Sequence, residues 1–310
     1  MGCKKLMKIC IVGASGFIGS SLHGFFATHG IEVVTVSSNN TPKGYGYNDL
    51  EKADTCIEIL SDIDTVFYLC SANQHETENN PGTSVKIILG PLGHILRAKS
   101  NLPKLKLIYF STAQVFNSVA QEKTITNNTD CAPNNYYGLF HLYGENMLNY
   151  SRDKYQSSNA LSLRLTNSYG FLCSQTSNWQ APVVNDFIRS AHLEHTITMK
   201  SDGSPFRDFI EMSTLMEVCL KLTHENEIPK NLIVGSGLTV NLAYVANRIQ
   251  NIFATKFGKN IELNTSGEIK EPKIKASPRY MVDDNFCKRQ SADEIDKFLE
   301  KAILDFERFI

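Results

Sequence analysis

Short apolar, β-branched runs alternate with stretches of helical spacing along the first half of the chain. Lys8–Val12 is such a run, and Phe17–His29 then carries apolar residues at helical spacing until Gly30 ends it. This order predicts a strand, a tight turn and a helix. The further runs that predict strands are Ile31–Val36, Thr65–Cys70, Leu105–Phe110 and Ala160–Leu165.

Helical stretches separate most of these strands, and the strands are apolar along almost their whole length. Such strands are typical of a parallel sheet that helices cover on both faces. We therefore expect an α/β fold in which residues 1–170 form a doubly wound parallel sheet. Residues 171–310 are expected to form mainly a smaller α/β lobe, with a helix at Val183–Leu193, and residues 41–49 a surface turn.

The composition is that of a globular protein, because 42% hydrophobic residues in a chain of 310 suffice for a substantial core. The 31 Lys and Arg residues nearly balance the 32 Asp and Glu residues, which leaves a formal charge of −1. No basic stripe stands out, so nucleic acid is not expected as a partner. Eight scattered cysteines without a C-x-x-C pair are expected to be buried thiols in a reducing compartment.

No apolar run reaches the length of about 18 residues that would indicate a membrane-spanning helix. The N-terminal stretch passes directly into a glycine-rich turn without a small-residue cleavage site. We expect a cytoplasmic protein with no membrane partner and no metal site.

The stretch VGASGFIG places Gly13, Gly16 and Gly19 between the first strand and the first helix. Glycine is required where the backbone turns sharply, where it approaches a pyrophosphate, and where a helix packs closely on a strand. The amino end of the helix then faces the phosphates. The spacing is G-x-x-G-x-x-G rather than G-x-G-x-x-G, but its position directly after a strand favours nucleotide binding over a purely structural turn.

Two further stretches carry candidate chemistry. FSTAQVF follows an apolar run and places Thr112 at the carboxyl end of a strand, where open α/β sheets bind ligands. Its hydroxyl is suited to bonding a substrate oxygen, or simply to capping a turn. In YYGLFHLYGE, Tyr137 and His141 are four residues apart and share one helix face. This pair is either packing or half of a proton-transfer site, and the stretch alone leaves both open.

More stretches follow in a defined order: NDL at 48–50, DTVFYLCSA at 64–72, LRLTNSYG at 163–170 and GSPFRDFIE at 203–211. With those above, they have the order and approximate spacing of extended short-chain dehydrogenase/reductases. Over roughly residues 7–285 the chain resembles, more closely, the NAD-dependent epimerase/dehydratase group that acts on nucleotide sugars. The resemblance implies a Rossmann-type dinucleotide-binding domain, to which later segments return, and a small C-terminal substrate lobe.

The resemblance also implies roles for individual residues. Those expected to line the cofactor pyrophosphate are Gly13, Ser15, Gly16, Phe17, Ile18 and Gly19. Those expected elsewhere along NAD or NADP are Ser37, Asp49, Leu50, Leu69, Cys70, Ser71, Tyr137 and His141. The catalytic positions are Thr112, Tyr137 and His141, and the substrate-binding positions are Thr112, Asn167 and Arg207.

His141 stands where the family has a lysine, which bonds the nicotinamide ribose and whose charge favours the tyrosinate. A histidine can still donate a hydrogen bond to the ribose. Its ordinary pKa is near 6.5, however, so it is mostly neutral at pH 7 and supplies little charge. Tyr137 is therefore expected to be a weaker base, by about one or two pKa units.

Three further departures bear on the reaction and the cofactor. Ala113 and Gln114 stand where the dehydratases have an Asp-Glu acid/base pair, which disfavours a 4,6-dehydratase. Ser37 replaces the acidic residue that would accept the adenosine ribose hydroxyls, so NAD and NADP both stay open, with a slight preference for NAD. Lys43 is a candidate to reach a 2′-phosphate. Lys273 is the candidate for a second diphosphate-binding residue.

The expected function is that of a nucleotide-sugar epimerase or 4-ketoreductase, in which Tyr137 acts as acid and base during hydride transfer at a sugar carbon. The alternative is a dinucleotide-binding regulator or scaffold that has lost its chemistry, since His141 replaces the lysine. A homodimer is expected, because the resembling proteins associate through helices that correspond to residues 85–99 and 137–150.

Overall fold

The computed structural model describes residues 7–38, 44–120, 122–155, 159–171 and 182–309. The chain divides into two compact units. Unit 1 consists of residues 1–120, 127–165 and 219–232, and unit 2 of residues 121–126, 166–218 and 233–310. The chain enters unit 2 briefly at residues 121–126, passes to it again between Leu165 and Thr166, and returns to unit 1 for residues 219–232.

A seven-stranded sheet forms the centre of unit 1, in the order β10-β6-β5-β4-β1-β2-β3. Its pairings from β3 through β6 are parallel. β2 and β4 lie on opposite sides of β1, so the sheet is doubly wound, and the expected Rossmann-type fold is confirmed. The strands are β1 (Lys8–Val12), β2 (Glu32–Ser37), β3 (Tyr45–Gly46), β4 (Thr65–Tyr68), β5 (Lys106–Thr112), β6 (Ala160–Leu165) and β10 (Asn231–Val234).

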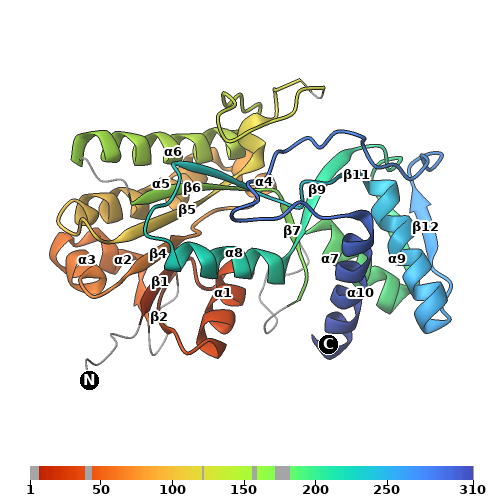
Figure 1. The fold of residues 1–310 in the computed structure, drawn as a ribbon, viewed down its shortest axis with the longest axis horizontal. Coiled ribbons are helices and arrows are strands. Elements are labelled where there is room, and N and C mark those ends of the chain that lie inside the picture. Colours follow the sequence, from red (N-terminus) through yellow and green to blue (C-terminus); the bar gives the residue numbers. More distant parts are fainter. Residues whose placement is uncertain (1–6, 39–43, 121, 156–158, 172–181, 310) are drawn as a thin grey trace. The chain divides into compact units, whose positions relative to one another are not determined.

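Helices cover both faces of this sheet, with α5 and α6 on one face and α1 on the other (Figure 1). They are α1 (Phe17–Thr28), α2 (Tyr47–Glu51), α3 (Ala53–Leu60), α4 (Gln74–Asn79), α5 (Pro81–Lys99), the 3₁₀ helix η1 (Ala113–Phe116), α6 (Tyr136–Tyr155) and α8 (Met212–His224). Buried apolar side chains such as Val12, Val66, Leu92 and Leu107 fill the space under α5. Burial on both faces explains why the strands are apolar throughout.

The observed strands fall where the apolar runs predict them, but the surface turn expected at 41–49 is wrong for residues 45–49. Tyr45–Gly46 forms β3, which pairs with the end of β2, and the chain then enters α2. The Asp49 carboxylate accepts a hydrogen bond from the Gly46 N–H at 2.9 Å and so caps α2. Lys43 lies outside the described residues.

The described part of unit 2 contains two small sheets, three complete helices and the first residues of α8. One sheet has the order β11 (Thr239–Asn241), β9 (Phe206–Glu211), β7 (Asn167–Tyr169), and the other pairs β12 (Glu262–Thr265) with β8 (Thr196–Met199). The helices are α7 (Val183–Glu194), α9 (Leu242–Phe257) and α10 (Ala292–Phe309). The helix expected at Val183–Leu193 is confirmed. The loop-like stretch that follows Phe171 lies mostly outside the described residues.

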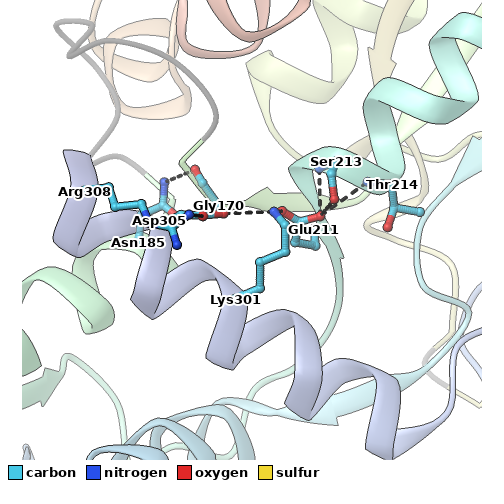
Figure 2. Close-up of polar contacts among 8 residues, drawn as sticks. All are labelled: Gly170, Asn185, Glu211, Ser213, Thr214, Lys301, Asp305 and Arg308. Carbon is cyan, nitrogen blue, oxygen red and sulfur yellow. Dashed lines mark hydrogen bonds and ion pairs between the residues drawn. The ribbon is translucent and has the colours of Figure 1, made fainter. Parts of the chain in front are cut away.

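A buried carboxylate connects the end of β9 to the start of α8 and to α10 (Figure 2). Glu211 ends β9 and accepts hydrogen bonds from the Ser213 N–H and hydroxyl and, at 3.4 Å, from the Thr214 N–H. Lys301 of α10 lies 3.0 Å from Glu211 and 2.9 Å from Asp305 (Figure 2). Because Glu211 is fully buried, these donors supply the bonds that water would otherwise make.

Six cysteines belong to the described residues, and all six are free thiols. Burial raises their pKa values, to about 12 for Cys70. None of the helices in the described segments is both long and apolar enough to cross a membrane.

Candidate active site

The turn between β1 and α1 is built from glycine for steric reasons. The Gly13 and Ala14 N–H groups both donate to the Val36 carbonyl, at 2.8 and 3.2 Å, which folds the turn back onto the end of β2. Gly13 has φ +98°, and a Cβ there would lie 2.9 Å from the Leu69 carbonyl carbon. A side chain at this position would therefore be strained and would collide with the segment that follows β4.

The same turn prepares the amino end of α1 for an anion. A Cβ on Gly19 would overlap the Gly13 carbonyl oxygen, so only glycine lets α1 pack this close to the turn. Gly16 occupies the N-cap position, and in the described structure no side chain caps the first turn. The N–H groups of that turn are the ones a phosphate would accept from. This cradle fits the pyrophosphate of a dinucleotide.

The other expected cofactor positions lie along the carboxyl edge of the sheet. Ser37 ends β2 and is buried, while Leu69 and Ser71 follow β4, half-buried and exposed respectively. Asp49 is engaged in capping α2, and the Leu50 side chain is fully buried in the core. Only the backbone of Leu50 therefore remains for contact with a ligand.

Thr112 is the last residue of β5, as expected, and its side chain caps η1. The Thr112 hydroxyl oxygen accepts the Gln114 N–H at 3.2 Å. The capping role that the sequence leaves open is thus present. The hydroxyl proton is not used in this bond, so a second bond to a substrate oxygen is compatible with the cap.

A polar chain fixes the amino end of α6, which carries Tyr137. Asn135 accepts the Gly138 N–H at 2.7 Å and donates to the Gln114 side chain at 2.9 Å. Gly138 is required here, because a Cβ would lie 2.7 Å from the Gln114 carbonyl oxygen. The Tyr136 N–H donates to Glu78 at 2.8 Å. The first turn of α6 is therefore held against η1 and α4.

A buried ion pair fixes the middle of α6 to the sheet. Arg164 of β6 lies 2.8 Å from Glu145, and both side chains are almost fully buried. Ser111 of β5 donates to Glu145 at 2.6 Å, and Arg164 also donates to the Asn127 carbonyl. Removing one partner of such a pair typically costs about 3–5 kcal/mol, because the other charge is left buried and unpaired. The position of α6 on the sheet is thus strongly determined.

Tyr137 and His141 are neighbours on one face of α6, and His141 lies one turn before Glu145. Their ring centroids are 4.7 Å apart with an interplanar angle of 61°. The Ser71 hydroxyl lies 3.1 Å from His141 Nε2, and the Tyr109 hydroxyl lies 3.1 Å from His141 Nδ1. Both ring nitrogens are therefore within hydrogen-bonding distance of hydroxyl groups.

Burial controls the ionisation of both residues. It lowers the pKa of His141 to about 4, so the imidazole is neutral at pH 7. It raises the pKa of the Tyr137 phenol, and a hydrogen bond with Ser71 acts in the opposite direction. The cluster thus places a half-buried phenol beside a hydroxyl donor and a neutral ring, with no positive charge from position 141.

Asn167 and Arg207 both belong to unit 2, where they lie on neighbouring strands. Asn167 begins β7 and donates to the Asp208 carbonyl at 2.8 Å, while Arg207 on β9 is exposed and donates to the Phe206 carbonyl. Asp208 is fully buried, and burial raises the pKa of its carboxyl to about 6. The structure thus brings the two expected diphosphate-binding residues to one small sheet.

The residue expected as a second diphosphate ligand is exposed: Lys273 lies 3.2 Å from Glu271. A different cation in the same part of unit 2 is buried. Arg279 lies with its guanidinium carbon 5.8 Å from the centre of the Tyr280 ring, and its backbone N–H donates to the Thr239 hydroxyl oxygen. The sequence analysis did not consider Arg279.

Sequence reasoning also missed the residues that hold the site together, namely Tyr109, Asn135, Glu145 and Arg164. A signal existed for one of them, since Asn three residues before Gly138 is typical of a helix cap. The pairing of Glu145 with Arg164 joins residues that are 19 positions apart on different elements. Local sequence spacing therefore does not predict this ion pair.

The fold and the glycine-lined turn define a Rossmann-type protein of the extended short-chain dehydrogenase/reductase kind. The sequence model of the NAD-dependent epimerase/dehydratase family matches residues 9–235 of this chain. The chain belongs to that family.

Curated relatives include UDP-glucuronic acid decarboxylases of Arabidopsis thaliana. Decarboxylase 4 is 24% identical over 246 residues, which cover 74% of this chain and 54% of the relative. Decarboxylase 1 is 23% identical over 278 residues, which cover 81% of this chain and 60% of the relative. The matches thus span little more than half the length of these relatives.

Solved structures of the same fold cover nearly the whole chain. A UDP-N-acetylglucosamine 4-epimerase from Methanobrevibacter ruminantium has a TM-score of 0.79 at 18% identity, covering 99% of this chain and 100% of its own. A UDP-glucuronic acid 4-epimerase from Bacillus cereus, in complex with UDP-glucuronic acid and NAD, has a TM-score of 0.75 at 18% identity, covering 98% and 100%.

Proposed function

We propose that the protein is an NAD(P)-dependent nucleotide-sugar epimerase or 4-ketoreductase that transfers hydride at a sugar carbon, with Tyr137 as acid and base. The observation that carries this proposal is the Tyr137 phenol, half-buried at the fixed amino end of α6 and in contact with the His141 ring. Family membership and relatives named for nucleotide-sugar reactions support it.

The glycine-lined turn is proposed to hold the dinucleotide through Gly13, Gly16 and Gly19, with Ser15, Phe17 and Ile18 beside them. When bound, the nicotinamide accepts or returns the hydride. Tyr137 removes the proton from the sugar hydroxyl or gives it back, and Thr112 orients that oxygen while it caps η1. Asn167 and Arg207 are proposed to hold the sugar diphosphate.

NAD is the proposed cofactor by a small margin. The Bacillus cereus UDP-glucuronic acid 4-epimerase structure contains NAD, which supports this choice. The margin is small because Ser37 offers no carboxylate that would repel the 2′-phosphate of NADP. Titration calorimetry with NADH and NADPH decides the point. A tenfold preference for NADPH, about 1.4 kcal/mol, would contradict the choice of NAD.

The activity is tested with a panel of UDP-, GDP- and dTDP-sugars that includes UDP-glucuronic acid, followed by nicotinamide absorbance and by NMR of the product. We expect turnover of at least one sugar with inversion or reduction at a ring carbon. Loss of carbon dioxide from UDP-glucuronic acid would instead assign the reaction named for the Arabidopsis relatives. Tight dinucleotide binding without any turnover would favour the second candidate, a regulator, which the histidine at position 141 motivates.

The protein is proposed to form a homodimer through the outer face of α5 and α6. An apolar groove of about 480 Å³ runs between these helices and is lined by residues that include Leu96, Tyr143, Met147 and Tyr150. The Tyr143 and Tyr150 rings are largely exposed. Light scattering at micromolar concentration is expected to give the mass of two chains, and Tyr143→Glu to give that of one. A single-chain mass for the unaltered protein would remove the proposal.

A further inference from the structure

Gln114 belongs to η1, and each of its polar atoms has a partner within the protein. Its backbone N–H donates to the Thr112 hydroxyl oxygen at 3.2 Å, and its carbonyl accepts the Asn117 N–H at 3.2 Å. Its side-chain amide donates to the Gln74 side chain at 3.2 Å and accepts from Asn135 at 2.9 Å. Gln114 therefore joins β5 and η1 to groups on α4 and at the start of α6.

A single backbone donor determines how these side-chain amides are oriented. The Gly138 N–H can only donate, so Asn135 must present its side-chain oxygen to it, at 2.7 Å. The Asn135 NH₂ group then faces Gln114, which presents its own oxygen and turns its NH₂ group toward Gln74. The direction of this amide chain (Asn135, Gln114, Gln74) is thus fixed from α6 through η1 to α4.

Gln114 also contacts the start of α6 through its backbone. A Cβ at position 138 would lie 2.7 Å from the Gln114 carbonyl oxygen, so only glycine lets α6 begin this close to η1. Asn135 accepts the Leu139 N–H at 3.0 Å with its carbonyl, in addition to its side-chain bond, and so caps the helix. Tyr137 lies in the first turn of this helix. Its position therefore depends on how Asn135 and Gln114 are held.

The two proposed catalytic hydroxyls are thus both connected to one residue. Thr112 accepts the Gln114 N–H directly. Tyr137 is connected through the Gln114 side chain, by way of Asn135 and the Gly138 N–H. A shift of Gln114 would therefore change the placement of both hydroxyls.

We propose that Gln114 is a positioning residue that sets the separation of the Thr112 and Tyr137 hydroxyls, and that it acts on Tyr137 through Asn135. This inference rests on the proposed roles of these two hydroxyls in proton transfer. Gln114 itself exchanges no proton, because an amide neither gains nor loses one at neutral pH. A misplacement of about 1 Å between reacting groups can lower a rate by about 10²-fold, so a residue that fixes both groups has a large effect on turnover.

The two ends of the amide chain are expected to differ in importance. Gln74 is the first residue of α4 and is exposed, so water can replace it as the acceptor for Gln114. Asn135 and Gln114 are both part-buried, and the bond between them orients the cap of α6. Loss of Gln74 should therefore be tolerated better than loss of the Gln114 side-chain amide.

The first test follows the cap of α6 and needs no substrate. NMR measures hydrogen exchange of the Gly138 amide, which Asn135 protects. Gln114→Met keeps the length of the side chain but removes both of its hydrogen bonds, and it is expected to speed this exchange about fivefold. Gln74→Met is expected to speed it by less than about twofold. Gln250→Met, which removes a bonded amide from α9 in unit 2, is the matched control and should leave the exchange unchanged.

The second test separates turnover from binding on a verified sugar. Gln114→Met is expected to lower kcat by about 10-fold to 10²-fold, while KM and the dinucleotide Kd stay within about twofold. Gln114→Glu keeps an oxygen for Asn135 and is expected to recover most of the lost kcat. Each variant is measured at its own optimum pH, since Gln114→Glu also adds a charge. Gln250→Met should have the kcat of the unaltered protein.

Four results would overturn the proposal. They are unchanged Gly138 exchange in Gln114→Met, an unchanged kcat in that variant, a loss of kcat matched by an equal rise in the dinucleotide Kd, and a loss that Gln114→Glu does not recover. Faster exchange in Gln114→Met, combined with no turnover of any sugar by the unaltered protein, would instead reject the proposed reaction. In that case Gln114 would remain the residue that holds the first turn of α6.

Discussion

Two of the buried polar clusters, one around His141 in unit 1 and one around Glu211 in unit 2, are built on opposite plans. In unit 1, His141 is neutral and meets two hydroxyl groups. In unit 2, Glu211 is fully buried and meets an ammonium group together with N–H and O–H donors. Lys301, which provides the ammonium group, keeps 40% of its side chain exposed (Figure 2).

The difference shows what each plan is suited to. A buried carboxylate is tolerated only with several donors and a counter-ion, and once these are assembled they fix the elements that carry them. A neutral imidazole needs fewer partners, and here one hydroxyl at each ring nitrogen is enough. The Glu211 cluster therefore anchors β9 and α10, whereas the His141 cluster sets a neutral ring against the Tyr137 phenol.

The largest expected effect comes from removing the Tyr137 hydroxyl, next to the His141 ring. Tyr137→Phe is expected to lower turnover of a verified sugar by about 10²–10⁴-fold, because phenylalanine has no hydroxyl to exchange the proton. Dinucleotide affinity and the unfolding temperature should change little. Tyr136→Phe is the matched control: it removes the hydroxyl of the adjacent tyrosine, and Tyr136 is 46% exposed. Full activity in Tyr137→Phe would show that the tyrosine and histidine are only packing.

The next largest effect is a loss of folding stability at low pH, which His141 causes. The folded protein holds the pKa of His141 at about 4, against 6.5 for an ordinary histidine, so protons bind the unfolded chain more readily. The stabilisation is complete above pH 6.5 and is lost as the pH falls toward 4, by on the order of 3 kcal/mol. Denaturant unfolding should show this loss in the unaltered protein but not in His141→Gln.

The comparison with His141→Gln also cancels the contribution of a second titrating group, Asp208, to the pH dependence of stability. Burial raises the pKa of Asp208 to about 6, which stabilises the folded state as the pH falls and so has the opposite sign. This contribution is the same in both proteins and cancels in the difference. Equal pH dependence in the two proteins would mean that His141 takes up its proton without unfolding.

A third change turns the neutral cluster into a charged one. His141→Lys is expected to keep or raise turnover at pH 7 and to extend activity to lower pH by about one unit, because a fixed charge favours the tyrosinate by about 1.4 kcal/mol. The pH profile of kcat is the measurement. His141→Met, which matches the length of lysine without its charge, serves as the control. A profile shifted alike by both variants would exclude the charge as the cause.

The smallest effect is expected at the charged cluster of unit 2. Lys301→Met should lower the free energy of unfolding by about 1 kcal/mol or less, because the ammonium group is part-exposed and its pairing is screened by water. Glu211 would retain its Ser213 and Thr214 donors. Urea unfolding measures the change, with Lys297→Met on the same helix as control. A loss of several kcal/mol would show that the ion pair, rather than the other donors, makes this burial possible.

Local sequence patterns were sufficient for most of the sheet. The bounds of β1 and β6 coincide with their apolar runs, because a strand that is buried on both faces has to be apolar along its length. The same reasoning missed β3, whose two residues, Tyr45 and Gly46, are held by pairing with β2 rather than by their own pattern. Short edge strands have too few residues to show a period.

The candidate site was predictable only where its residues are close in sequence. Spacing alone placed Tyr137 and His141 on one face of α6, and the rings are in contact. The hydroxyl of Tyr109 reaches His141 from a position 32 residues away, and its approach depends on the absence of a side chain at Gly144. No local spacing encodes such a contact, which is set by how β5 and α6 pack together.

The return of the chain to unit 1 has a consequence for the order in which the protein can fold during synthesis. β10 occupies one end of the seven-stranded sheet, next to β6, yet it begins at Asn231 and β6 ends at Leu165. A ribosome that has just released β6 has still to make β7, α7, β8, β9 and α8 before the neighbour of β6 exists. Until then the nascent sheet carries an unpaired apolar strand at that edge, a surface on which a chaperone or another nascent chain can dock.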